Sequence, residues 1–487
     1  MGHRRGSAAW RLRAAWLAVT FVPSGSLSTS RTAPQRGAGA PRAAAVELEL
    51  KPRQRSIDVY RTQPTSDDSM LWDQQRESTK HRHIIHLDQP PPIADPFALV
   101  KDELQPFGDN IKQLVQSDNP VLSDAAAHFF EKRHGKRFRP TIVALVARAL
   151  PLAVPAAFSP NATAAAEARA LVTGRQARLG QITEMIHVAS LIHDDVLDDA
   201  DTRRGGDAIH KMYSNKVAVL AGDYLLARAS VLLAKLQNAE VVEVMARALD
   251  SLVSGEIMQI KSTNAAAKKS AADGDETALS PADLAAAQAK PSLYARARDA
   301  LALGGARRAP AAASPQVREQ EAVEMELYLR KSYYKTASLI CDACRSCALL
   351  AGHVYESPTA AAVEEYGYHL GLAFQIVDDV LDLCVNSEDL GKPAGADLQL
   401  GLATAAILYA AREHPTELRP LIDRRFKGDG DVQRAVEIVQ ASGGLDLARK
   451  LARWHAQCAV DAISALPESE ARDALVSVCY VVLTRAK

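Results

Sequence analysis

From residue 95 to the C-terminus, apolar side chains recur at intervals of three and four residues, which places them on one face of an α-helix. The alternating pattern of strands is nearly absent. Leu99, Leu104 and Ile111 begin the helical pattern, after Asp95 and Pro96, residue types that favour a helix start. The pattern predicts an all-α bundle with helices near residues 137–150, 179–200, 216–237, 239–262, 321–351, 359–384, 400–412, 432–440, 444–465 and 468–485.

Two stretches interrupt this pattern, residues 151–175 and 263–316. The first is rich in Ala and Pro, and the second is richer still in Ala, Gly, Ser and Pro, with few large apolar residues. Such a composition cannot bury enough surface to offset the entropy lost on ordering. We expect both to be surface insertions in a catalytic domain over residues 95–487, the second disordered. A regulatory docking loop is the alternative for the second.

The N-terminal part has a different character. Residues 1–46 contain no Asp or Glu and carry seven arginines, a composition typical of mitochondrial or chloroplast transit segments. The apolar run Ala14–Val22 leaves a secretory signal peptide as one alternative, and an unprocessed tail is another. Arginines that continue to Arg42 favour a transit segment. Residues 47–94 are polar and Pro-rich, which predicts a linker.

Composition and charge narrow the class of protein. Aromatic residues are only 5% of the chain while Ala is abundant, which favours helices over sheets. Lys+Arg and Asp+Glu both number 58, and this balance argues against a general nucleic-acid or anionic-membrane binder. The six cysteines do not suggest a small disulfide-stapled secreted domain in a chain of this length. No run approaches the ~18 consecutive apolar residues of a transmembrane helix.

The candidate chemistry begins with two acidic motifs. Residues 187–198 read HVASLIHDDVLD, and residues 374–382 read FQIVDDVLD. Carboxylates one helical turn apart can bind Mg²⁺ through single oxygens, although a lone motif of this kind is more often a solvated helix end. An apolar run precedes each motif, so we expect both at the mouth of one apolar cavity. Clustered carboxylates without counter-charge are strongly unfavourable, which indicates metal ions near Asp194, Asp195, Asp198, Asp378, Asp379 and Asp382.

Basic residues near both motifs supply the other half of a site. Arg suits phosphate oxygens by bidentate hydrogen bonds, and Lys suits them as a point charge. Acid clusters and cations around an apolar cavity imply a ligand with a diphosphate head and a hydrocarbon tail. The candidates are Lys136, Arg137 and Arg139 in HGKRFRP, Arg203 and Arg204 after the first motif, Lys335 and Thr336 in YYKTASL, and Lys392 after the second motif.

These motifs resemble the trans-isoprenyl diphosphate synthases, or polyprenyl synthetases. The resemblance covers the chain from about residue 95, and it is carried by HGKRFRP, LIHDDVLDDADTRRG, SNKVAVLAGDYLLARA, GEIMQ, YYKTASL, FQIVDDVLD and GKPAGADLQLG. The set is most similar to mitochondrial, particularly fungal, long-chain members that make the ubiquinone side chain. It implies an isoprenoid synthase-type helical bundle around a central apolar cavity. It also implies a location on the matrix side, a homodimer or heteromer, and a peripheral position at the inner membrane for product release.

The resemblance assigns roles to residues of this chain. Isopentenyl diphosphate is expected at Lys136, Arg139, His187 and Arg204. An allylic diphosphate (geranyl, farnesyl or geranylgeranyl) is expected at Arg203, Lys335, Thr336 and Gln375, with Lys392 as a further candidate. Two to three Mg²⁺ ions are expected through Asp194, Asp198, Asp378 and Asp382. Ala189 and Ser190 lie five and four residues before the first Asp of the first motif and are too small to block a growing hydrocarbon chain. The resemblance therefore implies a long product of about C30 to C50.

Two other functions stay open beside this one. A terpene cyclase also uses a DDxxD helix, but it usually lacks a second motif and an isopentenyl site. A non-catalytic subunit of a heteromeric synthase is the other alternative, and such subunits lose the acidic motifs that this chain keeps. Cys341, Cys344 and Cys347 invite a metal interpretation, but their place in an apolar helical run favours small core residues.

Overall fold

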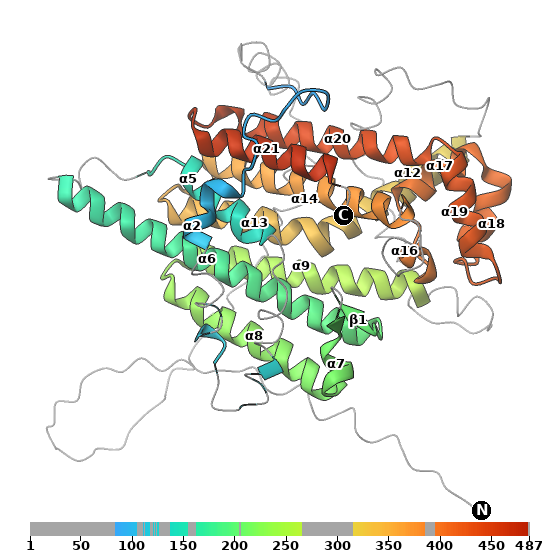
Figure 1. Ribbon diagram of the computed structural model, residues 1–487, viewed down its shortest axis with the longest axis horizontal. Helices are drawn as coiled ribbons and strands as arrows, with labels where there is room; N and C mark the ends of the chain where they lie inside the picture. Colours follow the sequence, from blue (N-terminus) through green and yellow to red (C-terminus); the bar gives the residue numbers. More distant parts are fainter. Residues whose placement is uncertain are drawn as a thin grey trace, which may run out of the picture. The chain divides into compact units, whose positions relative to one another are not determined.

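The described residues of the chain form an α-helical bundle, which confirms the predicted fold class (Figure 1). The computed structural model describes residues 83–104, 111, 113–116, 120, 122, 124–125, 137–153, 162–203, 206–264, 315–384 and 395–485. Within these ranges, strands occur only in one small antiparallel hairpin, β1 (Thr202–Arg203) and β2 (Gly206–Asp207).

The helices follow the predicted order closely. They are η1 (Ala98–Val100), α2 (Lys101–Leu104), α5 (Phe138–Ala149), α6 (Ala162–Leu197), α7 (Ile209–Met212), α8 (Asn215–Lys235), α9 (Ala239–Asn264), α12 (Pro315–Ser332), the π-helical turn η3 (Tyr333–Ala337), α13 (Ser338–Leu350), α14 (Pro358–Cys384), α16 (Ala396–Gln399), α17 (Ala405–Glu413), α18 (Pro415–Asp423), α19 (Asp431–Ala441), α20 (Gly444–Ala462), η4 (Ile463–Ala465) and α21 (Glu470–Thr484).

Helices α13 and α14 form the centre of the bundle. Every residue of α13 is buried, and the helix contacts α5, α6, α9 and α14. Helices α20 and α21 pack against α14 on one side, while α8 packs against α6 on the other (Figure 1). The core is therefore a contiguous apolar cluster that runs through all of these helices. Cys341, Cys344 and Cys347 of α13 are buried free thiols in this core, as predicted.

Several element boundaries differ from the sequence-based prediction. Helix α6 begins at Ala162, so residues 162–175 of the first predicted insertion extend this helix, and the described side chains 169–174 are mostly exposed. Helix α18 was not predicted, because Pro415 opens it and Pro420 lies inside it. The predicted helix 321–351 is interrupted by the π-helical turn η3. Each difference is local and leaves the order of the helices unchanged.

Two predicted segments lie mostly outside the described residues. These are the transit segment 1–46 and the second insertion, 263–316, although α9 ends at Asn264 and α12 begins at Pro315. The predicted linker, 47–94, is described from residue 83. From there to Ile93 it is not a free linker, because it hydrogen-bonds to α20 and α21.

Helix α8 is both long and apolar. Among the described helices it is the one long and apolar enough to cross a membrane, with a mean hydropathy of 1.7. It contacts α6, α7 and α9, and Ala221, Leu225 and Leu232 are buried. The helix is thus one layer of the bundle, with an apolar outer face.

Candidate active site

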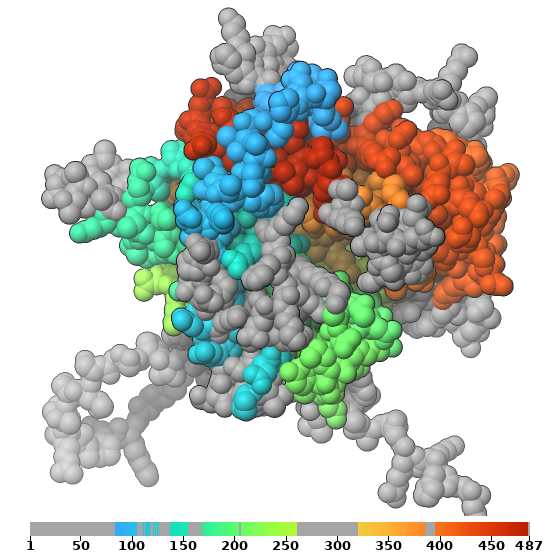
Figure 2. Space-filling model, viewed as in Figure 1, coloured from blue at the N-terminus to red at the C-terminus, as the bar shows by residue number. Residues whose placement is uncertain are grey.

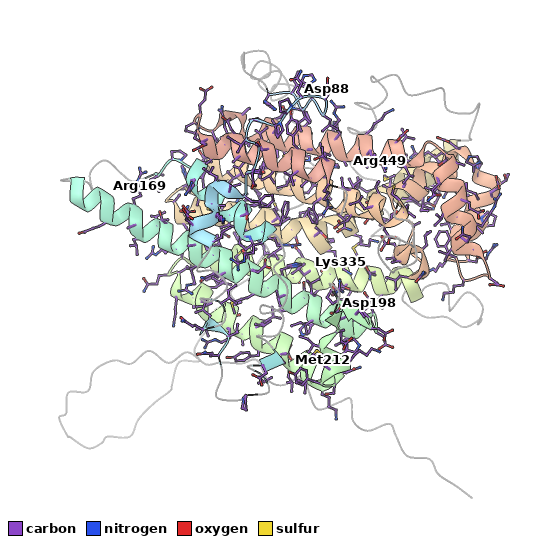
Figure 3. All side chains as sticks on the ribbon, in the orientation of Figure 1. Asp88, Arg169, Asp198, Met212, Lys335 and Arg449 are labelled. Carbon is purple, nitrogen blue, oxygen red and sulfur yellow. The ribbon has the colours of Figure 1, made fainter. Side chains whose placement is uncertain are left out.

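The first acidic motif lies at the C-terminal end of α6, where Figure 3 labels Asp198, and its three carboxylates have different surroundings. Asp195 is buried and accepts a hydrogen bond from Arg203 Nε at 2.6 Å. Asp194 is half-buried, with Oδ2 3.8 Å from Lys335 Nζ. Asp198 is exposed, and its side chain makes no hydrogen bond or ion pair with another described residue. Asp194 and Asp198 therefore present oxygens that protein groups leave largely unoccupied.

The second acidic motif lies near the end of α14, and its first two carboxylates are engaged by protein groups. Asp379 is buried, and both of its oxygens accept hydrogen bonds at 2.7 Å, from the Tyr328 hydroxyl and from Gln375 Nε2. Asp378 forms an ion pair with Arg485 in which Oδ1 lies 2.6 Å from Nη2. Asp379 thus anchors α14 to α12, whereas Asp378 keeps one oxygen outside its ion pair.

Asp382 completes the second motif by holding the start of α16. Its two oxygens accept hydrogen bonds from the backbone amides of Ala396 at 3.2 Å and Asp397 at 3.1 Å. This contact brings the Asp397 carboxyl group beside the motif. Burial, with the neighbouring Asp382 charge, raises the pKa of Asp397 to about 6. Asp397 is therefore a fourth carboxyl group at this end of the site.

Lys335 connects the first motif to α9. Its ammonium group lies 2.8 Å from Glu256 Oε1, donates to Gln259 Oε1 at 3.0 Å, and faces Asp194. Burial alone would lower the pKa of Lys335, but the Asp194 and Glu256 carboxylates outweigh it and raise the pKa above its usual value. Lys335 is therefore a half-buried, charged ammonium group at the centre of the site.

Thr336 connects the same turn to the second motif. Its hydroxyl donates to Gln375 Oε1 at 2.6 Å, and Gln375 in turn donates to Asp379. The turn is π-helical, a geometry that often marks functional positions. Gly255 of α9 and Gly371 of α14 lie so close to it that a Cβ atom would stand 3.1 Å from Lys335 N and 2.5 Å from Ala337 Cα. One turn thus brings α6, α9 and α14 together.

Burial raises the pKa of several carboxyl groups of the site. Burial raises the pKa of Asp194 to about 7, helped by Glu256 and opposed by Lys335. Burial and the Asp397 charge raise the pKa of Asp379 to about 8. The pKa of Asp378 is also raised by burial, against the opposing charges of Arg485 and Arg139. Protons or divalent cations are needed to balance these acids at neutral pH.

The donor set fits hard divalent cations such as Mg²⁺. Asp194 in the last turn of α6 and Asp198 directly after this helix offer carboxylate oxygens, and Asp378 on α14 offers an oxygen outside its ion pair. Asp195 and Asp379 are instead committed to hydrogen bonds within the protein. The predicted metal set is therefore supported by open oxygens at Asp194, Asp198 and Asp378. Both oxygens of Asp382 already accept amides, so Asp382 fits this set less well.

The predicted diphosphate-binding residues are only partly placed. Arg139 lies in the first turn of α5, and its charge acts on Asp378. His187 is half-buried on α6, two turns before Asp194. Arg203 is held by Asp195, so its expected diphosphate contact requires sharing or release of that pair. Lys136, Arg204 and Lys392 lie outside the described residues.

The two predicted chain-length residues lie on α6. Ala189 is fully buried. Ser190 is half-buried, and its hydroxyl donates to the His187 carbonyl at 2.9 Å. Neither side chain is large, as the sequence indicated, and the path of a product past them stays a prediction.

Sequence reasoning missed several members of the site. Glu256 and Gln259 belong to the GEIMQ motif, which supported the resemblance without receiving a role. Asp397 likewise lies in GKPAGADLQLG. Tyr328 and Lys335 lie seven residues, or about two turns, apart in one helical run, and this spacing was a usable signal. Nothing local marked Arg485, which reaches Asp378 from the C-terminal end of α21.

Comparison with known proteins places this geometry in context. The sequence pattern of the polyprenyl synthetase family matches residues 119–277 and 310–439. Mitochondrial solanesyl-diphosphate synthase 1 of Oryza sativa subsp. japonica is 40% identical over 400 residues, which cover 81% of this chain and 79% of that protein. A probable mitochondrial hexaprenyl pyrophosphate synthase of Neurospora crassa is 39% identical over 423 residues, covering 81% and 83%.

A solved structure has the same helical arrangement. The crystal structure of a polyprenyl synthase from Caulobacter crescentus CB15, complexed with calcium and isoprenyl diphosphate, superposes with a TM-score of 0.58 at 26% identity. The superposition covers 84% of this chain and 100% of the other. The similarity therefore extends from sequence motifs to the whole bundle.

Proposed function

The chain belongs to the polyprenyl synthetase family and is a prenyltransferase, and from that premise we propose that it is a long-chain trans-polyprenyl diphosphate synthase of ubiquinone biosynthesis. It condenses isopentenyl diphosphate repeatedly onto an allylic diphosphate, either geranyl, farnesyl or geranylgeranyl diphosphate. The observation that carries this proposal is the π-helical turn, where Lys335 faces the first acidic motif and Thr336 bonds through Gln375 to the second.

The chemistry assigned to the site starts with departure of the allylic diphosphate. Asp194, Asp198 and Asp378, with Asp382 as a further predicted ligand, would hold two to three Mg²⁺ ions, and such ions would supply positive charge for the leaving group. Lys335 adds a fixed ammonium charge close to the same place. The alkene of isopentenyl diphosphate, held at Arg139 and His187, attacks the allylic cation. A proton then passes to the released diphosphate, so the reaction needs no protein base.

The bundle supports this chemistry by excluding water. Helix α13 is buried along its whole length, and α14 is buried on most of its faces up to Asp379. Water in the site would capture the allylic cation and end elongation. The apolar helices thus exclude water, so that the allylic cation reacts with the alkene of isopentenyl diphosphate instead.

A direct test is product analysis by mass spectrometry with purified protein, isopentenyl diphosphate and farnesyl diphosphate. We expect a polyprenyl diphosphate between hexaprenyl and decaprenyl, about C30 to C50, formed only with Mg²⁺ present. A cyclised hydrocarbon without consumption of isopentenyl diphosphate would establish a terpene cyclase instead. Product formation only after addition of a second subunit would establish a heteromer.

The proposed oligomer is a homodimer formed through the outer face of α8 and α9. Large apolar side chains are exposed along both helices, among them Leu220 at 56%, Val253 at 59% and Ile257 at 48%. A face of this kind is typical of a contact with another subunit. A heteromer would use the same face. Sedimentation equilibrium distinguishes a dimer from a monomer, and co-flotation with vesicles tests the peripheral membrane position.

The proposed location is the mitochondrial matrix. The composition of residues 1–46 supports import, and the Oryza and Neurospora relatives are named as mitochondrial proteins. A reporter fused to residues 1–46 tests the location, and retention in the cytosol would contradict it.

The proposed insertion over residues 263–316 is supported by the interruption of the family match between residues 277 and 310.

A further inference from the structure

A segment before the predicted catalytic domain is part of the folded unit. Residues 83–93, here called the N-terminal strap, lie across α20 and α21, as the blue segment over the red helices in Figure 2. On the α20 side, the Gln457 amide accepts from Ile85 N at 2.9 Å and donates to the His83 carbonyl at 3.0 Å. Arg453 Nη2 donates to the Ile85 carbonyl at 2.6 Å. The strap backbone is thus held by side chains built into α20.

The strap holds α21 in the same way. The Tyr480 hydroxyl lies 3.1 Å from His83 Nε2 and accepts from the His86 amide at 3.2 Å. Ser477 Oγ accepts from the Ile93 amide at 2.8 Å. Contacts to both helices from one short segment join α20 to α21 across the outer surface of the bundle.

One side chain of the strap is buried beneath it, while its neighbour faces outward. Ile85 is 1% exposed and belongs to the core cluster, whereas its neighbour Ile84 is 55% exposed. Burial of an isoleucine removes apolar surface from water and favours the docked state. Ile84 and Ile85 therefore form a matched pair, one carrying the contact and one not.

The far end of α21 reaches the active site. Arg485 follows the helix directly, its guanidinium lies 3.9 Å from the centre of the Phe374 ring, and Nη2 donates to the Phe374 carbonyl at 2.7 Å. The same group holds Asp378 of the second acidic motif. Tyr480, which binds the strap, lies little more than one turn before Arg485. Movement of α21 would therefore move Arg485 away from Asp378.

We propose that the N-terminal strap is a positioning element of the active site, which seats α21 so that Arg485 pairs with Asp378. Removal of a presequence must then stop before His83, because a shorter chain loses the strap. The role of Asp378 as a metal ligand rests on the proposed function. The docking of the strap and the position of α21 do not rest on it.

The test is hydrogen exchange by mass spectrometry on the full chain, comparing Ile85→Ala with Ile84→Ala. We expect amide exchange over residues 470–485 to rise about tenfold in Ile85→Ala and to stay unchanged in the control. Tyr480→Phe, which removes the hydroxyl that His83 and His86 contact, repeats the test if Ile85→Ala does not fold. Unchanged exchange over α21 in both Ile85→Ala and Tyr480→Phe would overturn the proposal.

A second readout separates positioning from simple stabilisation. Arg485→Gln removes a cation that competes for Asp378, so we expect the Mg²⁺ concentration for half-maximal thermal stabilisation to fall about threefold. Ile85→Ala should shift it in the same direction, and the double variant should show no further shift. A shift in Arg485→Gln alone would refute the positioning role. Neither readout requires turnover, and the exchange readout does not require Mg²⁺ binding either, so failure of the proposed function leaves the test of strap docking distinguishable.

Discussion

The two acidic motifs have the same DDVLD sequence but different surroundings. At the end of α6, Asp194 and Asp198 keep oxygens available for a cation. On α14, Asp379 accepts from Tyr328 and Gln375, and Asp382 holds the start of α16. The first motif thus leaves carboxylate oxygens open, while most oxygens of the second accept hydrogen bonds from neighbouring helices. Identical motifs therefore make different contacts because the neighbouring elements differ.

The largest expected effect comes from the open carboxylates. Asp194→Ala and Asp378→Ala should each lower turnover by about a thousandfold or more, because the leaving group loses its cations. Circular dichroism should show unchanged helix content. Asp201→Ala is the matched control, since its side chain is 86% exposed and contacts Lys211. Near-normal condensation rates in either variant would contradict the two-motif metal site.

The next effect concerns product length, at equivalent positions on the two motif helices. Ala189 and Ala373 each lie five residues before the first Asp of a motif, and both are fully buried. Ala189→Phe should block the predicted tunnel and shift products to about C15 to C20. Ala373→Phe should overpack the core beside α13 and α20 without that shift, and lower the melting temperature. An active Ala189→Phe enzyme with full-length product would show that the tunnel does not pass this residue.

The structural task of the second motif is tested by Tyr328→Phe. Removal of the hydroxyl leaves Asp379 Oδ2 buried without its donor, which should lower the free energy of unfolding by about 1–3 kcal/mol. Asp198→Asn on the first motif should leave stability unchanged, because Asp198 is exposed. Denaturant unfolding without metal measures both. Equal losses of unfolding free energy in Tyr328→Phe and Asp198→Asn would contradict a structural task specific to the second motif.

The dependence on pH sharpens the comparison further. The folded-state pKa of Asp194 is raised to about 7 and that of Asp379 to about 8, chiefly by burial. The folded protein then holds protons that the unfolded chain releases near the ordinary carboxyl pKa, so metal-free stability should fall as pH rises from about 4 to 8. Mg²⁺ should raise the melting temperature more at pH 8 than at pH 6. Asp194→Asn should flatten the metal-free decline, and an unchanged slope would contradict this assignment.

The smallest effect is expected from replacing residues 265–314, which follow α9 and precede α12 in the sequence. Helix α9 contributes Glu256, which pairs with Lys335 beside the first motif, and α12 contributes Tyr328, which donates to Asp379 of the second. Replacing residues 265–314 with a short Gly/Ser linker should preserve folding and turnover, because the free energy of loop closure varies slowly with length. Solubility and product length measure this. Loss of soluble protein would show that the segment packs or docks.

Much of the fold could be predicted from the sequence because helix formation is local. The apolar spacing located nearly all of the longer helices, since one helix face must be buried whatever its partner. The pattern failed where local signals were ambiguous. Helix α18 was not predicted because Pro420 lies inside it, and the first half of α6 was not predicted because the stretch before residue 176 is rich in Ala. The strap at Ile85 was predicted as a linker because its partners, α20 and α21, are distant in sequence.

The sequence by itself identified the two acidic motifs and the basic residues of the candidate site, and it showed the family resemblance. Only the tertiary structure decided how the two copies of DDVLD differ. Contacts with Tyr328, Lys335 and Arg485 come from α12, the π-helical turn and the end of α21, all distant in sequence from the carboxyl groups that they contact. The physical reason is that helix periodicity acts over a few residues. The pKa of a buried carboxyl group depends instead on every charge and donor packed around it.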